Sequence, residues 1–192
     1  MGCDDSKHLK YKGIEINGKL PEFVSNLEKL GFEKVFENGS ECMMNFERTT
    51  VIVQFSKGDK GVYKVTEMFP PDESDMEWDS RKQKFNLTWS ASKKKYNSVK
   101  KKTTAKYGKP SFSVFGFDTP YTEGDGREFD AIRKGKCMYL SGWRLSNGEL
   151  LLGFHPDFYF TTLTYNDRLN SEKYGVGEII TPEMLEKVQK NN

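Results

Sequence analysis

The residues best suited to catalysis are few in this sequence. There are two histidines, His8 and His155, and three cysteines, Cys3, Cys42 and Cys137. A cysteine nucleophile would need Cys42 or Cys137 beside His155, because a histidine base must reach the thiol. The chain contains no Gly-x-Ser-x-Gly, P-loop, Cys-x-x-Cys or His-Glu-x-x-His motif. We therefore assign no catalytic residue and expect a protein that is not an enzyme, with an enzyme of unrecognised type as an alternative.

Carboxylates gather between residues 72 and 79, in the sequence DESDMEWD. Asp72, Asp75, Glu77 and Asp79 are oxygen ligands of the kind that hard cations prefer. Their spacing lacks the glycine and the final glutamate of an EF-hand loop. We expect an exposed acidic loop whose charges complement the start of the following helix, and we assign no metal and no cofactor.

Lysines form two runs, at residues 93–95 and 100–102, which are seven residues apart and overlay after two helical turns. One interpretation is a basic surface for acidic groups, with Lys94 and Lys101 as the contacts. The other is a solvated helix face whose lysine stems cover apolar surface. The chain has 30 basic and 28 acidic residues, a net charge of +2. Because a nucleic-acid-binding domain is usually basic overall, we predict no nucleic-acid partner.

Three aromatic residues lie close together in the segment 115–121, beside glycine and proline. Phe115, Phe117 and Tyr121 could form the rim of a ligand-binding site, since rigid aromatic side chains on loops are common recognition anchors. The alternative is that they cap the end of a sheet.

Two helices are expected to position these groups. In the segment 85–110, a stripe of mainly apolar residues recurs at helical spacing, and Gly108 and Pro110 end the helix. The stripe consists of Phe85, Trp89, Ser92, Tyr96, Val99, Thr103 and Tyr107. An earlier helix over 20–30 has Pro21 in its first turn and Gly31 at its end.

Alternating segments predict the strands. A strand at 9–18 ending in Asn17-Gly18 precedes the first helix, and four more follow it, at 33–37, 41–48, 50–57 and 61–69. After the long helix we expect strands at 112–117, 129–133, 136–145, 149–154 and 158–166. A loop at 174–177 and a last helix at 182–190 complete the chain.

The sequence thus predicts an α+β fold of two similar halves, each a helix followed by an antiparallel sheet, at about 9–70 and 80–170. Residues 1–8 are expected to form a flexible tether, and 9–192 a single domain. Aromatic residues, at 14% of the chain, supply the core. No apolar run approaches the 18 residues of a membrane-spanning helix. Cys42 and Cys137 are either bonded to each other or, as we favour, two half-buried thiols.

The first residues, Met1 to Ser6, match two lipidation patterns. One is N-myristoylation at Gly2 with palmitoylation at Cys3, which would place the protein in the cytoplasm at a membrane. In the other, Cys3 followed by Asp4, Asp5 and Ser6 resembles the first mature residues of lipoproteins that Bacteroides-type bacteria export. Residues left over from cloning are the third interpretation.

A wider resemblance supports the second pattern. Four segments of the chain are similar to a family of exported lipoproteins from the same bacteria. They are 8–18 (HLKYKGIEING), 30–32 (LGF), 106–110 (KYGKP) and 165–167 (YND). This chain differs from the family at Glu15 and Asn17 and in its lysine-rich helix. The family has no known activity, so the resemblance implies no site residues. We therefore expect an exported, lipid-anchored binding or interaction module in the periplasm or on the outer membrane, with a protein, peptide or glycan ligand.

Overall fold

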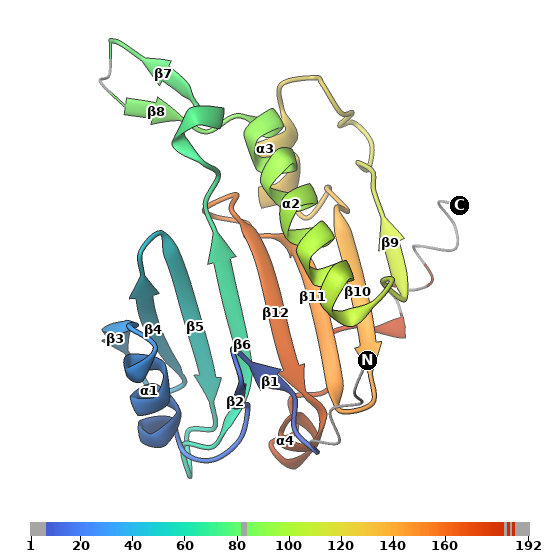
Figure 1. Cartoon of the computed structure of the whole chain (residues 1–192). Helices are drawn as coiled ribbons and strands as arrows, with labels where there is room; N and C mark the ends of the chain where they lie inside the picture. Colours follow the sequence, from blue (N-terminus) through green and yellow to red (C-terminus); the bar gives the residue numbers. More distant parts are fainter. Residues whose placement is uncertain (1–6, 82–83, 183, 185, 187–192) are drawn as a thin grey trace. The chain divides into compact units, whose positions relative to one another are not determined.

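The computed structural model describes residues 7–81, 84–182, 184 and 186, and within them it shows an α+β fold (Figure 1). Cys3 and most of the expected helix 182–190 lie outside the described residues. The main sheet is antiparallel and has eight strands in the order β3-β4-β5-β6-β12-β11-β10-β9. These are β3 (Glu33–Glu37), β4 (Glu41–Phe46), β5 (Thr49–Phe55), β6 (Val62–Phe69), β9 (Phe112–Val114), β10 (Leu140–Leu145), β11 (Gly148–Phe154) and β12 (Thr161–Asp167). The α+β prediction is confirmed.

The chain forms two compact units, each assembled from separate segments. Unit 1 contains the described residues up to Glu67 together with Arg144–Leu151 and Leu163–Pro182. Unit 2 contains the described residues of Met68–Trp143 together with Leu152–Thr162.

Unit 1 is built around helix α1 (Leu20–Lys29), whose buried face consists of Leu20, Phe23, Val24 and Leu27. Pro21 lies in its first turn, and Gly31 follows the helix with φ +92°, a conformation that glycine adopts without strain. In the neighbouring hairpin, Cys42 pairs with Val53 and Met44 with Val51, and all four side chains are buried. The alternation of these strands therefore supplies one apolar face to the core of unit 1, as the sequence predicts.

The edge strand β3 is irregular. Its pairing with β4 runs from Glu33↔Asn45 to Glu37↔Cys42, and the register shifts by one residue between Lys34 and Phe36. Val35 is therefore the additional residue of a β-bulge. Asn38 closes the hairpin, because its Oδ1 accepts hydrogen bonds from the backbone N–H groups of Ser40 and Glu41, each at 2.8 Å.

The start of the chain differs from the prediction. Instead of one strand over 9–18, a small hairpin forms from β1 (Lys10–Tyr11) and β2 (Ile14–Glu15), because Lys12 and Gly13 both adopt positive φ and reverse the chain. His8 does not belong to a free tether. Its Nδ1 lies 3.1 Å from the carboxylate of the fully buried Asp167, which also accepts the Leu9 N–H at 2.7 Å. Asp167 also caps helix α4 (Arg168–Lys173), an element that the sequence pattern does not predict.

Unit 2 contains the long helix α2 (Trp89–Tyr107), which lies along one face of this unit's strands (Figure 1). Two expectations here are wrong. Residues 129–133 form a helix, α3 (Glu128–Arg133), instead of a strand. Its buried residues, Glu128, Ala131 and Ile132, follow the i, i+3, i+4 spacing of one helix face, and its first turn is acidic. Phe85 belongs to the ribbon of β7 (Glu77–Asp79) and β8 (Lys84–Asn86), so the long helix begins four residues later than its apolar stripe. The remaining turn of helix is η1 (Glu73–Asp75).

None of the helices in the described part of the chain has the length and the apolar character that crossing a membrane requires.

Candidate functional site: the aromatic and basic face of α2

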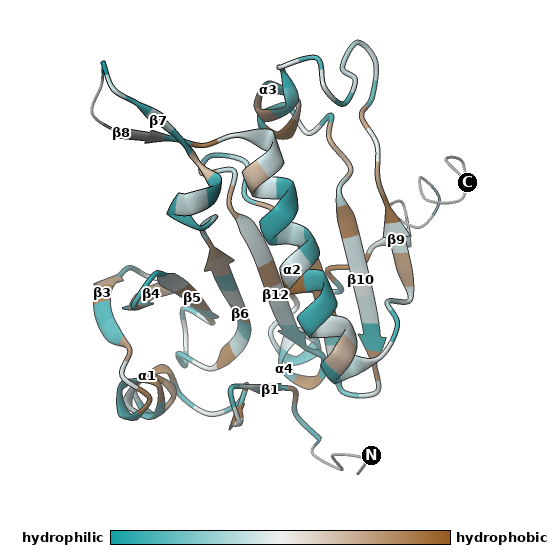
Figure 2. Ribbon diagram, turned by 45° about the horizontal axis from the view of Figure 1, so that its top comes forward, coloured by the Kyte–Doolittle hydropathy of each residue, from teal (hydrophilic) through white to brown (hydrophobic). Residues whose placement is uncertain are grey.

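Helix α2 has one buried side and one solvated side. Thr88 caps its start, with Oγ1 accepting the Ala91 N–H at 3.1 Å, and Gly108 ends it with φ +84°. Ser92, Tyr96, Val99 and Thr103 are buried, as the predicted stripe requires, while Trp89 is half-buried. Figure 2 shows hydrophilic residues along the outer side of the helix. Burial of the opposite side therefore leaves Lys94, Lys101, Lys102 and Lys106 in solvent, whereas Lys93, Lys95 and Lys100 are half-buried at the borders between the two sides.

Six rings pack together beside this helix and form what we call the aromatic cluster. Tyr139 lies at its centre, because its ring contacts all five others. The Trp89 ring centroid lies 5.6 Å from that of Phe117, 5.0 Å from that of Tyr139 and 5.3 Å from that of Phe154. Tyr96 and Phe115 complete the cluster through further contacts with Tyr139, at 5.9 and 5.2 Å. Such offset and edge-on ring pairs are favourable beyond the area that they bury. The structure thus brings two of the three predicted rim residues, Phe115 and Phe117, against α2.

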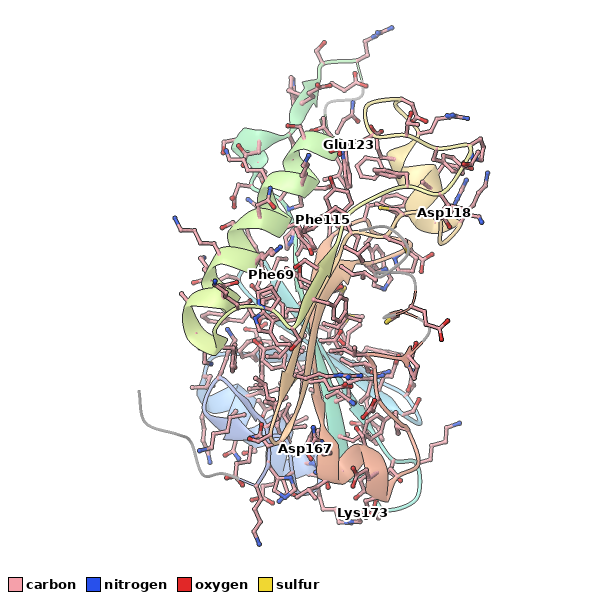
Figure 3. The ribbon with its side chains drawn as sticks, turned by 90° about the vertical axis from the view of Figure 1, so that its right-hand side faces the viewer. Phe69, Phe115, Asp118, Glu123, Asp167 and Lys173 are labelled. Carbon is pink, nitrogen blue, oxygen red and sulfur yellow. The ribbon has the colours of Figure 1, made fainter. Side chains whose placement is uncertain are left out.

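Phe115 is the exposed member of the aromatic cluster. Its side chain is 48% exposed, whereas Tyr96 and Tyr139 are buried. The ammonium group of Lys100 lies 4.4 Å from the centroid of the Phe115 ring, within the range of a cation–π interaction. Figure 3 shows Phe115 and Glu123 beside α2 at different heights along the helix. An apolar ring and a cation are therefore presented together at this surface.

Lys100 is held in place by a chain of hydroxyl groups. Its Nζ donates to Ser113 Oγ at 3.0 Å, and Ser113 Oγ lies 2.8 Å from Ser141 Oγ. Ser113 and Ser141 are paired across β9 and β10. Partial burial lowers the pKa of Lys100 from its ordinary value. The ammonium group is therefore positioned by a strand pair as well as by its own helix.

Glu123 fixes the other end of the aromatic cluster. Its Oε1 accepts from Trp89 Nε1 at 3.1 Å and from Lys93 Nζ at 2.5 Å, and its Oε2 accepts from Tyr139 OH at 2.9 Å. The hydrogen bond from Lys93 lowers the pKa of Glu123, and the same bond raises the pKa of Lys93. One exposed carboxylate thus orients the indole and a tyrosine hydroxyl.

The acidic loop pairs with the first lysine run, as the sequence predicts. Lys94 Nζ lies 2.5 Å from Asp75 and Lys95 Nζ 2.9 Å from Asp72. Lys94, one of the two predicted anionic contacts, therefore has a carboxylate partner of its own. Lys101, the other, is exposed and has no ion pair within the described residues. Among the residues that the structure describes, no group of three acidic, histidine or cysteine side chains is arranged to hold a metal ion.

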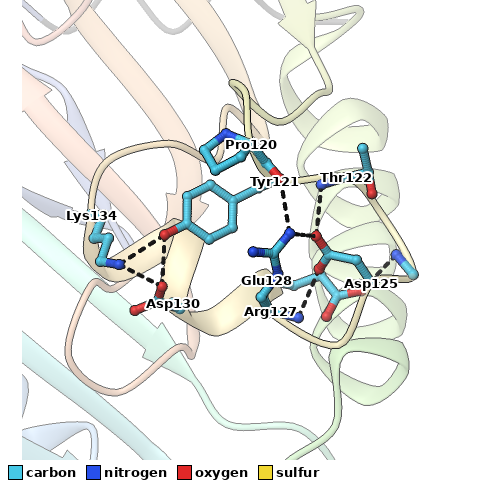
Figure 4. A network of polar contacts seen from close by, with 9 residues as sticks. Pro120, Tyr121, Thr122, Asp125, Arg127, Glu128, Asp130 and Lys134 are labelled. Carbon is cyan, nitrogen blue, oxygen red and sulfur yellow. Dashed lines mark hydrogen bonds and ion pairs between the residues drawn. The ribbon is translucent and has the colours of Figure 1, made fainter.

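Tyr121, the third predicted rim residue, lies in a separate network (Figure 4). It is 7% exposed, its hydroxyl donates to Asp130 Oδ2 at 2.7 Å, and Lys134 Nζ donates to that hydroxyl at 2.9 Å. The guanidinium group of Arg127 lies over its ring at 5.2 Å. Hydrogen bonds from Lys134, Tyr121 and Arg133 hold the pKa of Asp130 well below its usual range. Tyr121 therefore organises the loop between β9 and α3 and is not available as a rim residue.

The thiols and the second histidine show no sign of activation. Cys42 and Cys137 are both free thiols, as we favoured, but only Cys137 is half-buried, whereas Cys42 is fully buried. Burial raises the pKa of Cys137 to about 12 and also raises that of Cys42, so neither side chain is a ready thiolate. His155 Nδ1 accepts the backbone N–H of Asp157 at 3.2 Å in a turn of unit 2, and burial lowers the pKa of His155.

Unit 1 has an open hollow of about 250 Å³ beside the first turns of α1. It is mainly polar and is lined by Ile14, Glu15, Asn17, Gly18, Glu22, Phe23 and Asn26. Its charged groups are carboxylates. Because it lacks an exposed aromatic anchor, it is a weaker candidate for a binding site than the Phe115 surface.

Comparison with known protein families, with curated protein sequences and with solved structures found no match to this chain.

Proposed function

We propose that the protein is a non-enzymatic binding module whose ligand contacts Phe115 and Lys100. The observation that carries the proposal is the exposed Phe115 ring beneath the Lys100 ammonium group, 4.4 Å away. Large aromatic side chains on a rigid support dominate the energetics of many interfaces. Here the support is the buried part of the aromatic cluster together with the Ser113 and Ser141 hydroxyl groups. The binding surface is preorganised, so little order has to be imposed when a ligand binds.

The chemistry of this surface favours a protein or peptide ligand that places an apolar side chain on Phe115 and an acidic one near Lys100. A carboxylate would gain a charge-assisted hydrogen bond from an ammonium group that is already positioned. A glycan is the alternative ligand, because sugar rings also stack on aromatic side chains.

A binding screen with matched variants tests this proposal. Libraries of acidic-apolar peptides and of glycans would be screened against the full chain, and the hits measured with Phe115→Ala. Phe158→Ala is the control, because Phe158 is 52% exposed and lies in the same unit, outside the aromatic cluster. We expect at least a tenfold loss of affinity for Phe115→Ala, since a central aromatic contact is typically worth more than about 1 kcal/mol. Equal loss for both variants, or no hit at all, would overturn the proposal.

We also propose that the protein is exported and anchored through a lipid on Cys3, in the periplasm or at the outer membrane. The support is the Cys-Asp-Asp-Ser start and the resemblance of several segments between residues 8 and 170 to a family of exported lipoproteins. Mass spectrometry of the protein made from its full natural gene tests this location. A diacyl or triacyl cysteine at the N-terminus supports export. A myristoylated Gly2 would instead indicate the alternative, a cytoplasmic peripheral-membrane protein.

An enzyme of unrecognised type would respond differently to substitution of its candidate catalytic residues. Its most direct test is a pair of variants, Cys137→Ala and His155→Ala, assayed for binding of any ligand from the screen. Unchanged binding together with a loss of ligand turnover would support the enzyme and contradict the proposed module.

A further inference from the structure

The lysines of α2 differ sharply in what surrounds them. In the first run, Lys93, Lys94 and Lys95 each contact a carboxylate, that of Glu123, Asp75 and Asp72 respectively. The residues seven positions later are Lys100, Lys101 and Lys102, which occupy the same helical phases two turns on. Of these, Lys100 contacts Ser113 and Phe115, and no carboxylate accompanies any of the three within the described residues.

The second half of the helix therefore ends in an uncompensated basic surface. We call it the basic end of α2 and define it by Lys101, Lys102, Lys106 and Lys109. All four are exposed, and none has an ion pair or a hydrogen bond to another side chain among the described residues. Lys106 Nζ lies over the ring of its neighbour Tyr107, 4.9 Å from the centroid. Four positive charges are thus concentrated in a chain whose net charge is only +2.

Helix stability alone does not account for this arrangement. Cations near a helix C-terminus interact favourably with the helix dipole, but the effect is confined to the last turn. Lys106 lies in that turn, whereas Lys101 and Lys102 lie before it. Like charges four residues apart on a helix, such as Lys102 and Lys106, destabilise it. The first run has counter-charges and the basic end has none in the described structure.

We propose that the basic end of α2 docks on the anionic surface of a phospholipid bilayer. Lys101, Lys102 and Lys106 project from the solvated side of the helix, and Lys109 follows its end. Each ammonium group is a point charge on a flexible stem, unlike the planar guanidinium group of arginine. A diffuse layer of acidic headgroups matches such charges, and lysines near a membrane surface add their contributions. The proposal goes beyond the binding of a ligand at Phe115 and does not depend on it.

Nucleic acid is the competing partner, and the structure disfavours it. Binding of single strands relies on aromatic rings that stack on bases within a basic groove. Here Tyr96 is fully buried beneath the helix, on the side opposite Lys101. The basic end contains lysines only, without the arginines that read base edges or phosphates in a bidentate manner.

Vesicle binding tests the proposal with a charge-matched control. The full unacylated chain would be sedimented with phosphatidylcholine vesicles containing about one third phosphatidylglycerol, and with pure phosphatidylcholine. The test variant is Lys101→Gln, Lys102→Gln, Lys106→Gln. The control is Lys93→Gln, Lys94→Gln, Lys95→Gln, which removes the same charge from the same helix.

We expect the native chain to bind only the anionic vesicles at low salt and to dissociate as salt rises. The test variant should lose on the order of 100-fold in partition coefficient, taking about fivefold for each lysine. The control should lose at most a few fold. Binding of native protein to neither vesicle, or an equal loss in both variants, would overturn the proposal.

Two additional measurements separate the competing explanations. A DNA duplex that binds through the same three lysines, while anionic vesicles do not, would overturn the proposal in favour of nucleic acid. Phe115→Ala should bind vesicles as the native chain does. If it does not, vesicle binding belongs to the Phe115 surface and the assignment to the basic end is wrong.

Discussion

The hydroxyl groups of Tyr96 and Ser141 lie 2.8 Å apart, and neither side chain has any exposed surface. This hydrogen bond joins the middle of α2 to β10 at a position from which water is excluded. Burial also raises the pKa of Tyr96. The two partners are not equivalent. Ser141 has a second hydroxyl partner, Ser113, whose Oγ also lies 2.8 Å away. The hydroxyl group of Tyr96 is held by Ser141.

This asymmetry predicts unequal costs for removing the two hydroxyl groups. Tyr96→Phe leaves Ser141 hydrogen-bonded to Ser113 and should cost about 1 kcal/mol of unfolding free energy. Ser141→Ala leaves the buried Tyr96 hydroxyl without this partner and should cost about 2–3 kcal/mol. Urea denaturation measures both, and the double variant should be less destabilised than the sum of the two, because the groups are bonded to each other. A larger cost for Tyr96→Phe than for Ser141→Ala would contradict this account.

Gly148 is required because another part of the backbone lies against it. A Cβ atom at this position would lie 2.3 Å from the carbonyl oxygen of Asn166, which cannot rotate away. We predict that Gly148→Ala costs about 2–3 kcal/mol or more, as in other overpacked sites. Gly39→Ala is the control, since a Cβ there meets nothing within 4 Å, and its stability should change by less than about 0.5 kcal/mol. Thermal unfolding of both variants provides the measurement.

Asp167 joins the start of the chain to the end of β12. It accepts the Leu9 N–H at 2.7 Å and the Asn170 N–H at 2.9 Å, and it is fully buried. Asp167→Ala removes a helix cap and leaves a buried N–H without its acceptor, so we expect a loss of about 2–4 kcal/mol. Asp157→Ala, at an exposed turn position, should change stability little. Proteolysis would show whether residues 7–16 become accessible in Asp167→Ala, and continued protection there would argue against the role assigned to Asp167.

Glu123 makes stability depend on pH. Its pKa is lowered from 4.5 by the hydrogen bond from Lys93, so the ionised form is favoured in the folded state. The stabilisation is therefore present above the unfolded pKa and is lost as pH falls through the lower folded pKa. Because the carboxylate is exposed, the effect at pH 7 should be under about 1 kcal/mol. We expect Glu123→Gln to lower the unfolding midpoint at about pH 7 and to leave it nearly unchanged at a pH well below the folded-state pKa of Glu123, where the carboxyl group is protonated in both states. An equal deficit at both pH values would exclude this electrostatic origin.

The parts of the fold with strong periodicity or strong turn chemistry can be predicted from the sequence. Apolar spacing, Pro21 and Gly31 predict α1, and Asn38-Gly39 predicts the β3–β4 hairpin. The segment 129–133 is too short for its period to distinguish a helix from a strand, so the strand predicted there is wrong. Phe85 has the correct phase for the long helix, but pairing opposite Trp78 in a ribbon removes it from that helix. Periodicity indicates a face and does not fix where a helix begins.

The candidate site can be predicted only in part. Phe115, Phe117 and the lysine runs are recognisable in the sequence, because aromatic residues beside glycine and two lysine triplets seven residues apart are conspicuous local patterns. Glu123, Tyr139 and Phe154 are not, because they join Trp89 from segments that are more than 30 residues away along the chain. The rim role predicted for Tyr121 is wrong, since nothing local shows that Asp130 and Lys134 enclose its hydroxyl. Whether a lysine has a carboxylate partner depends on the same long-range contacts.

The bulge at Val35 affects how the protein behaves at high concentration. An exposed edge strand with apolar side chains is a template on which other chains can add strands and grow into fibres. β3 is such an edge, with Val35 and Phe36 exposed next to each other. Because the additional residue shifts the register within a strand of only five residues, an incoming straight strand finds no continuous ladder of backbone groups. The irregularity therefore protects the protein from aggregation at this edge.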